Sequence, residues 1–472
     1  MKSIQFLILI IFSGLATTGQ TMVQKTDSVS RLVQQYFNGR SPDKMYELTG
    51  EGFRKMITRE TFRRLGENQL LPLGSMELPV FEKITGDVVK YKVKFTDATL
   101  SLVISLDEKD KINTFLFQPY IEETKKKVAV PTSNKRKTPL DIQVDSAVRS
   151  YIERDAATGL SIGILRNGEQ YFYNYGELKK GSSQLPTENS LYEIGSITKT
   201  FTAILLADAV QSGMIRLNDP VSRYLPDSVG PLTYESKDIT VQMLSNHSSG
   251  LPRMPVNFTK YASDPFNPYK LYGVNQLFEF YKQFKPYRIP GSGYEYSNLA
   301  VGTLGVILEK IHDKTYDQLI TEKICRPLKM MDTHQFIQKT DSQRIAIGYN
   351  EQGIYNGPWD FQAFAGAGAL RSSASDMIKY AAANISTGHP ALHKAIQATH
   401  RETFTEGNTK TALGWIIIRP GTNEVLFHNG GTGGYRSYLA VNKEKKLAVI
   451  VLSNTNIGVD GIGNVLMKVL EN

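Results

Sequence analysis

The stretch Glu193–Leu206, "EIGSITKTFTAILL", decides how this chain is understood. It places a hydroxyl, Ser196, three residues before an amine, Lys199, at the start of an apolar run that is typical of a buried helix. Positions i and i+3 of a helix share a face, so we expect the two side chains to lie side by side. A desolvated lysine loses its charge and can then take the proton of a serine hydroxyl. Two common residues at this spacing also occur by chance, so the pair needs support from elsewhere.

Two later segments supply that support. Tyr296 and Asn298 stand just before a second apolar helix, and the run His428–Gly431, "HNGG", closes an apolar strand. A phenol can relay a proton, an amide can hold a peptide group, and glycines allow a close approach of backbone to substrate. Together with the serine and lysine, these are the residue types that an acyl-transfer site requires.

The order Ser196-x-x-Lys199, Tyr296-x-Asn298 and His428-x-Gly430 resembles the serine β-lactamase and penicillin-binding fold. Within that fold it resembles the class C β-lactamase and DD-peptidase branch, the S12-type serine hydrolases. The segments "LSNHSSGLP", "AGALRSSASDM" and "LGW" support the resemblance, which covers residues 140–472. It implies a mixed α/β (α+β) domain in which one antiparallel sheet is flanked by N- and C-terminal helices and carries a helical insert.

The resemblance also implies a role for each motif residue. Ser196 is expected to be the acylated nucleophile, Lys199 its base or proton relay, and Tyr296 the general base. The expected substrate-binding residues are Asn298, His428, Asn429, Gly430 and Gly431, the last through a backbone N–H that completes an oxyanion hole with that of Ser196. No metal or other cofactor is implied. A phenol has an ordinary pKa near 10, so Lys199 and His428 are expected to supply positive potential beside Tyr296.

His428 departs from the pattern of the β-lactamases of this branch, which usually carry lysine there to grip the β-lactam carboxylate. DD-carboxypeptidases, D-aminopeptidases and esterases more often carry histidine, which is only partly charged near neutral pH. We therefore expect a D-alanyl-D-alanine carboxypeptidase-like enzyme acting on peptidoglycan-type D-amino acid peptides. A class C-like β-lactamase or an esterase is the alternative, and a penicillin-binding sensor without turnover, or an envelope adaptor, is the alternative of another class. Arg436 is a second candidate for binding a carboxylate, although a strand arginine is more often solvated.

The N-terminus predicts export. Residues 1–20 form a signal-peptide pattern, with Lys2 followed by an apolar run over Phe6–Phe12 and then small and polar residues. The run is too short for a membrane span, and no later segment approaches the roughly 20 apolar residues that a span requires. A periplasmic or secreted, soluble protein without a stable membrane span is expected, with an uncleaved interfacial anchor as the alternative.

Between the signal and the hydrolase domain we expect two further parts. Residues 21–122 contain helical segments followed by the alternating strands 88–95, 99–108 and 112–120, and weakly resemble an NTF2-like accessory domain. Residues 123–139 form a basic linker. The formal net charge is +9, and six of the basic residues lie in this short region. Nucleic acid is not expected as a partner, because an exported chain without interleaved aromatic and basic residues on a sheet or helix lacks the features that bind it. In the last part, 140–472, Asn167-Gly168 predicts a hairpin between two strands.

Other reactive residue types are expected to be structural. Ser161 lies in a Gly-x-Ser-x-Gly match, but that motif needs a strand, a sharp turn and a helix, and Ser161 is followed by strand residues. Cys325 is the single cysteine, so no disulfide forms within the chain, and a buried thiol is expected. His247 is expected to hydrogen-bond rather than to act as a base. A zinc site is not supported by the remaining candidates, His389, His393 and His400.

Overall fold

A computed structural model describes residues 19–85, 87–120, 129–386, 388–418 and 423–471. The chain divides into two compact units, 1–122 and 123–472, and each has apolar core residues of its own. Of the predicted signal peptide, residues 1–18 lie outside the described residues, as do residues 123–128 of the predicted linker. Within the described ranges, no helix combines the length and apolar character needed to cross a membrane.

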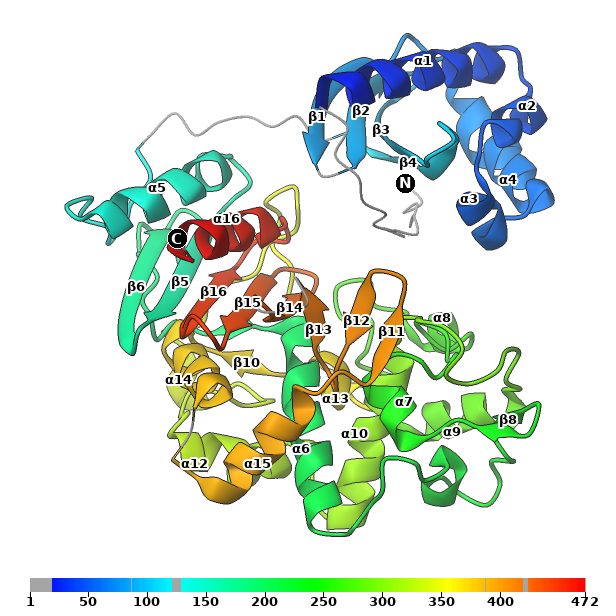
Figure 1. The fold of residues 1–472 in the computed structure, drawn as a ribbon. Coiled ribbons are helices and arrows are strands. Elements are labelled where there is room, and N and C mark those ends of the chain that lie inside the picture. Colours follow the sequence, from blue (N-terminus) through cyan, green and yellow to red (C-terminus); the bar gives the residue numbers. More distant parts are fainter. Residues whose placement is uncertain (1–18, 86, 121–128, 387, 419–422, 472) are drawn as a thin grey trace. The chain divides into compact units, whose positions relative to one another are not determined.

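The first unit packs helices against an antiparallel sheet of order β1-β2-β3-β4 (Figure 1). Its helices are α1 (Gly19–Asn38), α2 (Pro42–Glu47), α3 (Glu51–Met56) and α4 (Arg59–Leu65). Its strands are β1 (Val80–Thr85), β2 (Val88–Lys94), β3 (Thr99–Leu106) and β4 (Ile112–Pro119). The three predicted strands are therefore present. The likeness to NTF2-like domains stays a prediction.

Strand β1 was not predicted, and its burial explains why. Strand β2 alternates, with Val89, Tyr91 and Val93 fully buried between partly exposed lysines, and this period-2 pattern is what a sequence can reveal. In β1, an edge strand, Val80 and Phe81 are 61% and 43% exposed. Because β1 has no buried face, its apolar residues leave no periodic signal.

The second unit is built on an eight-stranded antiparallel sheet of order β11-β12-β13-β14-β15-β16-β5-β6. The N-terminal strands are β5 (Gly159–Arg166) and β6 (Glu169–Gly176). The C-terminal strands are β11 (Phe404–Glu406), β12 (Thr409–Thr411), β13 (Ile416–Ile418), β14 (Val425–Gly431), β15 (Arg436–Asn442) and β16 (Leu447–Ser453). The two ends of the unit therefore form one sheet, as predicted.

Helices cover both faces of this sheet (Figure 1). One face packs against α5 (Pro139–Ile152) and α16 (Asp460–Leu470), the predicted flanking helices. The other face packs against the inserted helices, among them α6 (Thr198–Gln211) and α14 (Ala374–Ile385). Alternate residues of β16 point into the two cores, with Val449 and Val451 toward α5 and α16 and Ile450 and Leu452 toward the insert. A strand buried on both faces reads as a continuous apolar run.

The insert also holds further helices and strands. Its remaining helices are α7 (Val241–Ser245), α8 (Phe258–Tyr261), α9 (Val274–Gln283), α10 (Asn298–His312), α11 (Tyr316–Ile320), α12 (Arg326–Leu328), α13 (Ala365–Gly368) and α15 (Pro390–Thr399). Its short strands are β7 (Tyr192–Glu193), β8 (Thr233–Tyr234), β9 (Lys237–Asp238) and β10 (Arg371–Ser372), and β7 pairs with β10.

Local sequence sets the start of the second unit. The Thr138 hydroxyl accepts the N–H of Asp141, whose carboxylate accepts the N–H of Thr138 in return, so a capping box begins α5. These backbone N–H bonds lower the pKa of Asp141 to about 2. The predicted hairpin forms at Asn167 and Gly168, both with positive φ (53° and 87°), which is the geometry of a type I′ turn.

Helix α16 offers a test of the sheet packing through two glycines of one helix. A Cβ on Gly463 would lie 2.3 Å from the ring of Tyr438 in β15, whereas one on Gly461 would meet no atom within 4 Å. We expect Gly463→Ala to lower the free energy of unfolding by about 1–3 kcal/mol, because the helix must move off the sheet. Gly461→Ala should instead raise it by about 0.4–1 kcal/mol. Urea denaturation of both variants checks this, and equal effects would contradict the packing described.

Candidate active site

The predicted nucleophile lies at the junction of the sheet and the insert. Ser196 occupies a short 3₁₀ turn, Gly195–Ile197, that leads directly into α6 and is called the nucleophile turn. Its neighbours Gly195 and Ile197 are buried, while Ser196 itself is partly exposed. Helix α6 is buried from Thr198 to Ala207. The turn is therefore fixed by the packing of its neighbours, and the Ser196 side chain remains partly accessible.

Three predicted side chains meet at this hydroxyl. The Nζ of Lys199 lies 2.9 Å from the Oγ of Ser196, and the phenol of Tyr296 donates a hydrogen bond to the same oxygen over 2.8 Å. Tyr296 comes from the segment before α10, one hundred residues further along the chain. The Lys199 Nζ also lies 5.0 Å from the centre of the Tyr296 ring. The structure therefore brings the serine, the lysine and the tyrosine together.

Burial favours the neutral form of the Lys199 amine. Its side chain has no exposed surface, and burial, followed by the charge of Arg253, holds the pKa of Lys199 well below its usual range. Its amine donates to the Ala367 carbonyl in α13 over 2.6 Å. An uncharged amine so placed can accept the proton of the Ser196 hydroxyl.

Tyr296 is positioned by its neighbours. The His247 ring packs against the tyrosine ring at 4.5 Å between centres, and His247 Nδ1 accepts the backbone N–H of Ser297 over 3.2 Å. Burial keeps the pKa of His247 well below its usual value, so the ring is neutral and structural, as expected. Burial raises the pKa of Tyr296 to about 12, against the opposing effects of the Ser196 hydrogen bond and the Arg253 charge.

The end of β14 forms the opposite wall. A Cβ on Gly430 would lie 2.0 Å from the Ile194 carbonyl oxygen, and one on Gly195, where φ is +50°, would lie 2.7 Å from the Gly431 nitrogen. Only glycine allows the strand and the nucleophile turn to approach this closely. The Ser437 hydroxyl of β15 donates to the Ile194 carbonyl over 2.8 Å and fixes the approach.

The N–H of Gly431 points to the free edge of this strand. Strand β13 pairs with β14 only up to Phe427. On the other side, the Thr432 N–H donates to the Tyr435 carbonyl. Hydrogen-bonded and non-bonded pairs alternate in an antiparallel ladder, so the Gly431–Arg436 pair is non-bonded and its N–H faces away from β15. This geometry supports Gly431 as an oxyanion donor.

The side chains of β14 divide between the two faces. His428 is buried, its ring centre 6.3 Å from that of Tyr296, and its Nδ1 lies 2.6 Å from the Asn429 carbonyl oxygen. Burial lowers the pKa of His428 to about 3, so it is neutral and does not supply the expected partial charge. The side chain of Asn429 is not brought into the site. It is exposed and donates to Asp460 of α16 over 2.7 Å.

Two further residues, Asn298 and Arg436, are candidates for binding substrate, and only Asn298 lies on the side of the nucleophile turn. The Asn298 amide nitrogen lies 3.8 Å from the Met254 sulfur, and its oxygen is buried without a hydrogen-bond partner among the described residues. The Arg436 guanidinium lies against Gly431 and is influenced by the carboxylates of Asp460 and Glu351. Successive side chains of a strand point to opposite faces. Because Ser437 points toward the nucleophile turn, its neighbour Arg436 points to the opposite face.

A buried ion pair that the sequence did not reveal supports the nucleophile. Glu193, three residues before Ser196, accepts from Arg371 of β10 over 2.9 Å and from the Trp359 N–H over 2.8 Å. The two charged side chains are only 5% and 6% exposed. Since β7 and β10 pair at these positions, the ion pair fixes the strand that delivers the nucleophile.

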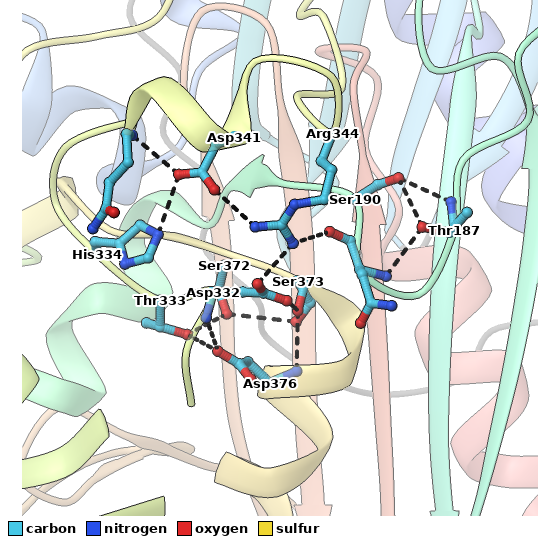
Figure 2. A network of polar contacts seen from close by, with 12 residues as sticks. Thr187, Ser190, Asp332, Thr333, His334, Asp341, Arg344, Ser372, Ser373 and Asp376 are labelled. Carbon is cyan, nitrogen blue, oxygen red and sulfur yellow. Dashed lines mark hydrogen bonds and ion pairs between the residues drawn. The ribbon is translucent and has the colours of Figure 1, made fainter. Parts of the chain in front are cut away.

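Figure 2 shows a polar network that connects the end of β10 and the start of α14 to the loop containing Asp332 and Arg344. The Ser373 hydroxyl caps α14 and donates to Asp332 over 2.8 Å. Arg344 donates to Asp332 and to Asp341, each over 2.7 Å. Backbone hydrogen bonds between His334 and Arg371 then connect this loop to β10.

The remaining sequence candidates have structural environments. Ser161 lies in β5 and hydrogen-bonds Tyr192 and the Thr187 carbonyl. Cys325 is buried, as predicted, and burial raises the pKa of its thiol. His400 contacts Asn384. Among the described residues, no cluster of metal-ligating side chains occurs.

Arg253 is the site residue that sequence reasoning missed. Its guanidinium carbon lies 5.1 Å from the centre of the Tyr296 ring. The available signal was its position: it directly follows "LSNHSSGLP", a segment that already supported the resemblance.

Comparison with known proteins gives one family. The profile described as Beta-lactamase matches residues 144–466. A beta-lactamase of Pseudomonas fluorescens is 28% identical over 353 residues, which cover 66% of this chain and 93% of that protein. The D-alanyl-D-alanine-carboxypeptidase/endopeptidase AmpH of Escherichia coli (strain K12) is 28% identical over 313 residues, covering 63% and 79%.

Solved structures agree. A class C beta-lactamase superposes with a TM-score of 0.64 at 25% identity, covering 72% of this chain and 99% of that one. A beta-lactamase/D-alanine carboxypeptidase from Pseudomonas syringae gives 0.62 at 25% identity, covering 71% and 99%.

The buried ion pair predicts a large loss of stability. Arg371→Met leaves the Glu193 carboxylate buried without its cation, so the free energy of unfolding should fall by about 3–5 kcal/mol. Arg149→Met, which removes a half-exposed arginine from a surface pair, should cost less than about 1 kcal/mol. Adding Glu193→Gln to Arg371→Met should recover part of the loss. Denaturant titrations check this, and similar losses for both arginines would contradict the role of the pair.

The neutral histidine predicts the shape of the pH profile. Hydrolysis should slow as pH falls through the pKa of Lys199, because the protonated amine cannot accept the Ser196 proton. His428→Gln should leave that acid limb in place, since a group whose pKa is about 3 does not titrate near neutrality. Profiles of kcat/KM for both proteins test this. An acid limb near pH 6–7 that disappears in His428→Gln would show that His428 is the titrating group.

Proposed function

The chain belongs to the beta-lactamase family, and on this premise we propose that it hydrolyses peptides ending in D-alanyl-D-alanine through an acyl-enzyme on Ser196. The observation that carries the proposal is the position of the Ser196 oxygen, 2.9 Å from the Lys199 amine and 2.8 Å from the Tyr296 phenol. A serine with two proton-transfer groups in hydrogen-bonding range has what nucleophilic catalysis requires.

In acylation, the Ser196 oxygen bonds to the carbonyl carbon of the penultimate D-alanine while its proton passes to the neutral Lys199 amine. The N–H groups of Ser196 and Gly431 stabilise the negative oxygen of the tetrahedral adduct. Collapse of the adduct breaks the carbon–nitrogen bond. Tyr296 donates its proton to the departing nitrogen, and the protonated Lys199 restores the phenol.

Deacylation uses the same groups in the reverse sense. A water oxygen bonds to the acyl carbon as its proton passes to the Tyr296 phenol and the phenol proton passes to the neutral Lys199 amine. The bond from the carbon to Ser196 then breaks, and the protonated Lys199 returns a proton to the serine oxygen. Asn298 binds the peptide amide on the acyl side, and the free edge of β14 at Gly431 offers its backbone N–H to the substrate. Each cycle consumes one water.

Two observations favour the peptidase over an antibiotic-hydrolysing enzyme. His428 is neutral, so β14 offers no cation of the kind that a β-lactamase lysine supplies. One relative is named as a D-alanyl-D-alanine-carboxypeptidase, and one similar structure as both beta-lactamase and D-alanine carboxypeptidase. A class C-like β-lactamase remains the second candidate, supported by the relatives of that name.

Export is part of the proposal. Peptidoglycan lies outside the cytoplasmic membrane, and the apolar run Phe6–Phe12 after Lys2 fits a signal peptide. Residues 21–122 are proposed as an NTF2-like accessory domain joined by the basic linker.

A substrate panel on the wild type and on Ser196→Ala tests the function. We expect the wild type to release D-alanine from a D-alanyl-D-alanine peptide, and Ser196→Ala to lose about ten-thousand-fold or more in kcat. Mass spectrometry should detect a covalent penicillin adduct on the wild type and on Ser161→Ala, the matched control, but not on Ser196→Ala.

The other outcomes separate the alternatives. Steady hydrolysis of a chromogenic cephalosporin without D-alanine release would identify a β-lactamase, and turnover of a short-chain ester alone an esterase. A single burst without turnover would identify a sensor. Activity that survives Ser196→Ala would place the site elsewhere.

A further inference from the structure

The position of Arg253 in the fold is fixed by the catalytic segment itself. Its backbone carbonyl accepts the N–H groups of Asn298 and Leu299, over 3.1 and 3.3 Å, at the start of α10. Through these bonds the residue is anchored two positions from Tyr296. The side chain is exposed, and its guanidinium carbon lies 5.1 Å from the centre of the Tyr296 ring.

The guanidinium has no acidic partner of its own. Among the described residues, no carboxylate forms an ion pair with it. Arg344 and Arg371, by contrast, pair with Asp332 and Glu193. Its charge nevertheless reaches the site, since it contributes to lowering the pKa values of Lys199 and His247. An exposed, unpaired arginine beside a reacting group is available to a ligand.

The other basic side chains of the site are poorly placed to bind an anion. Lys199 has no exposed surface, and its amine is already hydrogen-bonded to Ser196 and to the Ala367 carbonyl. His428 and His247 are buried and neutral. Arg436 points to the opposite face of β14, toward Asp460 and Glu351. A guanidinium is always protonated in proteins, so Arg253 brings a fixed positive charge to the Tyr296 side of the site.

The chemistry of the reaction brings an anion to this place. Tyr296 must come within hydrogen-bonding distance of the leaving-group nitrogen to protonate it. In a C-terminal D-alanine, the carbon attached to that nitrogen also carries the carboxylate. The carboxylate is therefore delivered next to Tyr296, where the guanidinium already lies.

We propose that Arg253 binds the carboxylate of the leaving group and so selects substrates with a free C-terminal acid. This inference rests on the proposed function and adds to it the residue that sets leaving-group specificity. A guanidinium can bind a carboxylate through two parallel hydrogen bonds, which orients the leaving group as well as attracting it. The cation that β14 lacks at His428 is thus supplied from the other wall of the site.

A pair of aryl esters tests the proposal without depending on peptidase activity. Both carry the same acyl group, but one leaving phenol bears a carboxylate and the other is neutral. We expect Arg253→Gln to lower kcat/KM for the charged ester by about 10–100-fold, as for loss of a hydrogen bond between charged groups, and that for the neutral ester by less than about threefold. Arg253→Lys should retain part of the preference. Arg223→Gln, which alters an arginine with a 67% exposed side chain in the same unit, should change neither.

Reversing the charge at position 253 should reverse the preference for the charge of the leaving group, which a purely structural role of Arg253 would not do. Arg253→Glu should prefer an ester whose leaving phenol carries an ammonium group over the carboxylate ester. Equal losses on the charged and neutral esters, or no loss on either, would overturn the proposal. Should Arg253→Gln fail to fold, as judged by circular dichroism, the Arg253→Lys and Arg253→Glu ratios decide it. Ester preferences that follow Arg253 in an enzyme releasing no D-alanine would refute the peptidase and leave the role of Arg253 standing.

Discussion

The structure depends on one buried amine. Lys199 has no exposed surface, and a charged ammonium at such a place would cost several kcal/mol. Burial therefore favours the neutral amine, which is the form that can accept a proton. The Ala367 carbonyl satisfies the amine and fixes its direction. The packing that buries α6 thus also sets the protonation of the amine proposed as the base.

That arrangement places demands on the surrounding fold. Glycines at 195 and 430 let a strand lie directly against the nucleophile turn, where a side chain at either position would force the two apart. The Glu193–Arg371 pair carries two charges into the interior just before the nucleophile. Such a pair adds little net stability compared with apolar residues, but removing one partner is costly. Its value here is that it fixes the position of one segment.

Electrostatics divides the site into two walls. On the β14 side, His428 is buried and uncharged. On the α10 side, Arg253 is exposed, with its guanidinium near Tyr296. Tyr296 stands between them with its pKa raised by burial to about 12, so the phenol keeps its proton near neutral pH. The exposed guanidinium and the uncharged histidine make the two walls of the site electrostatically different.

The sequence by itself determined the residue types of the site, the family resemblance, the strands of the first unit that have one buried face, and the joining of the terminal strands into one sheet. It could do so because helical spacing, period-2 burial and turn glycines are local patterns. Only the tertiary structure decided that Asn429 points away from the site, that His428 is neutral, and that Glu193 meets Arg371 and Arg253 meets Tyr296. Pairings between distant segments, and the burial that sets a pKa, depend on which surfaces the folded chain brings together, and no local pattern encodes them.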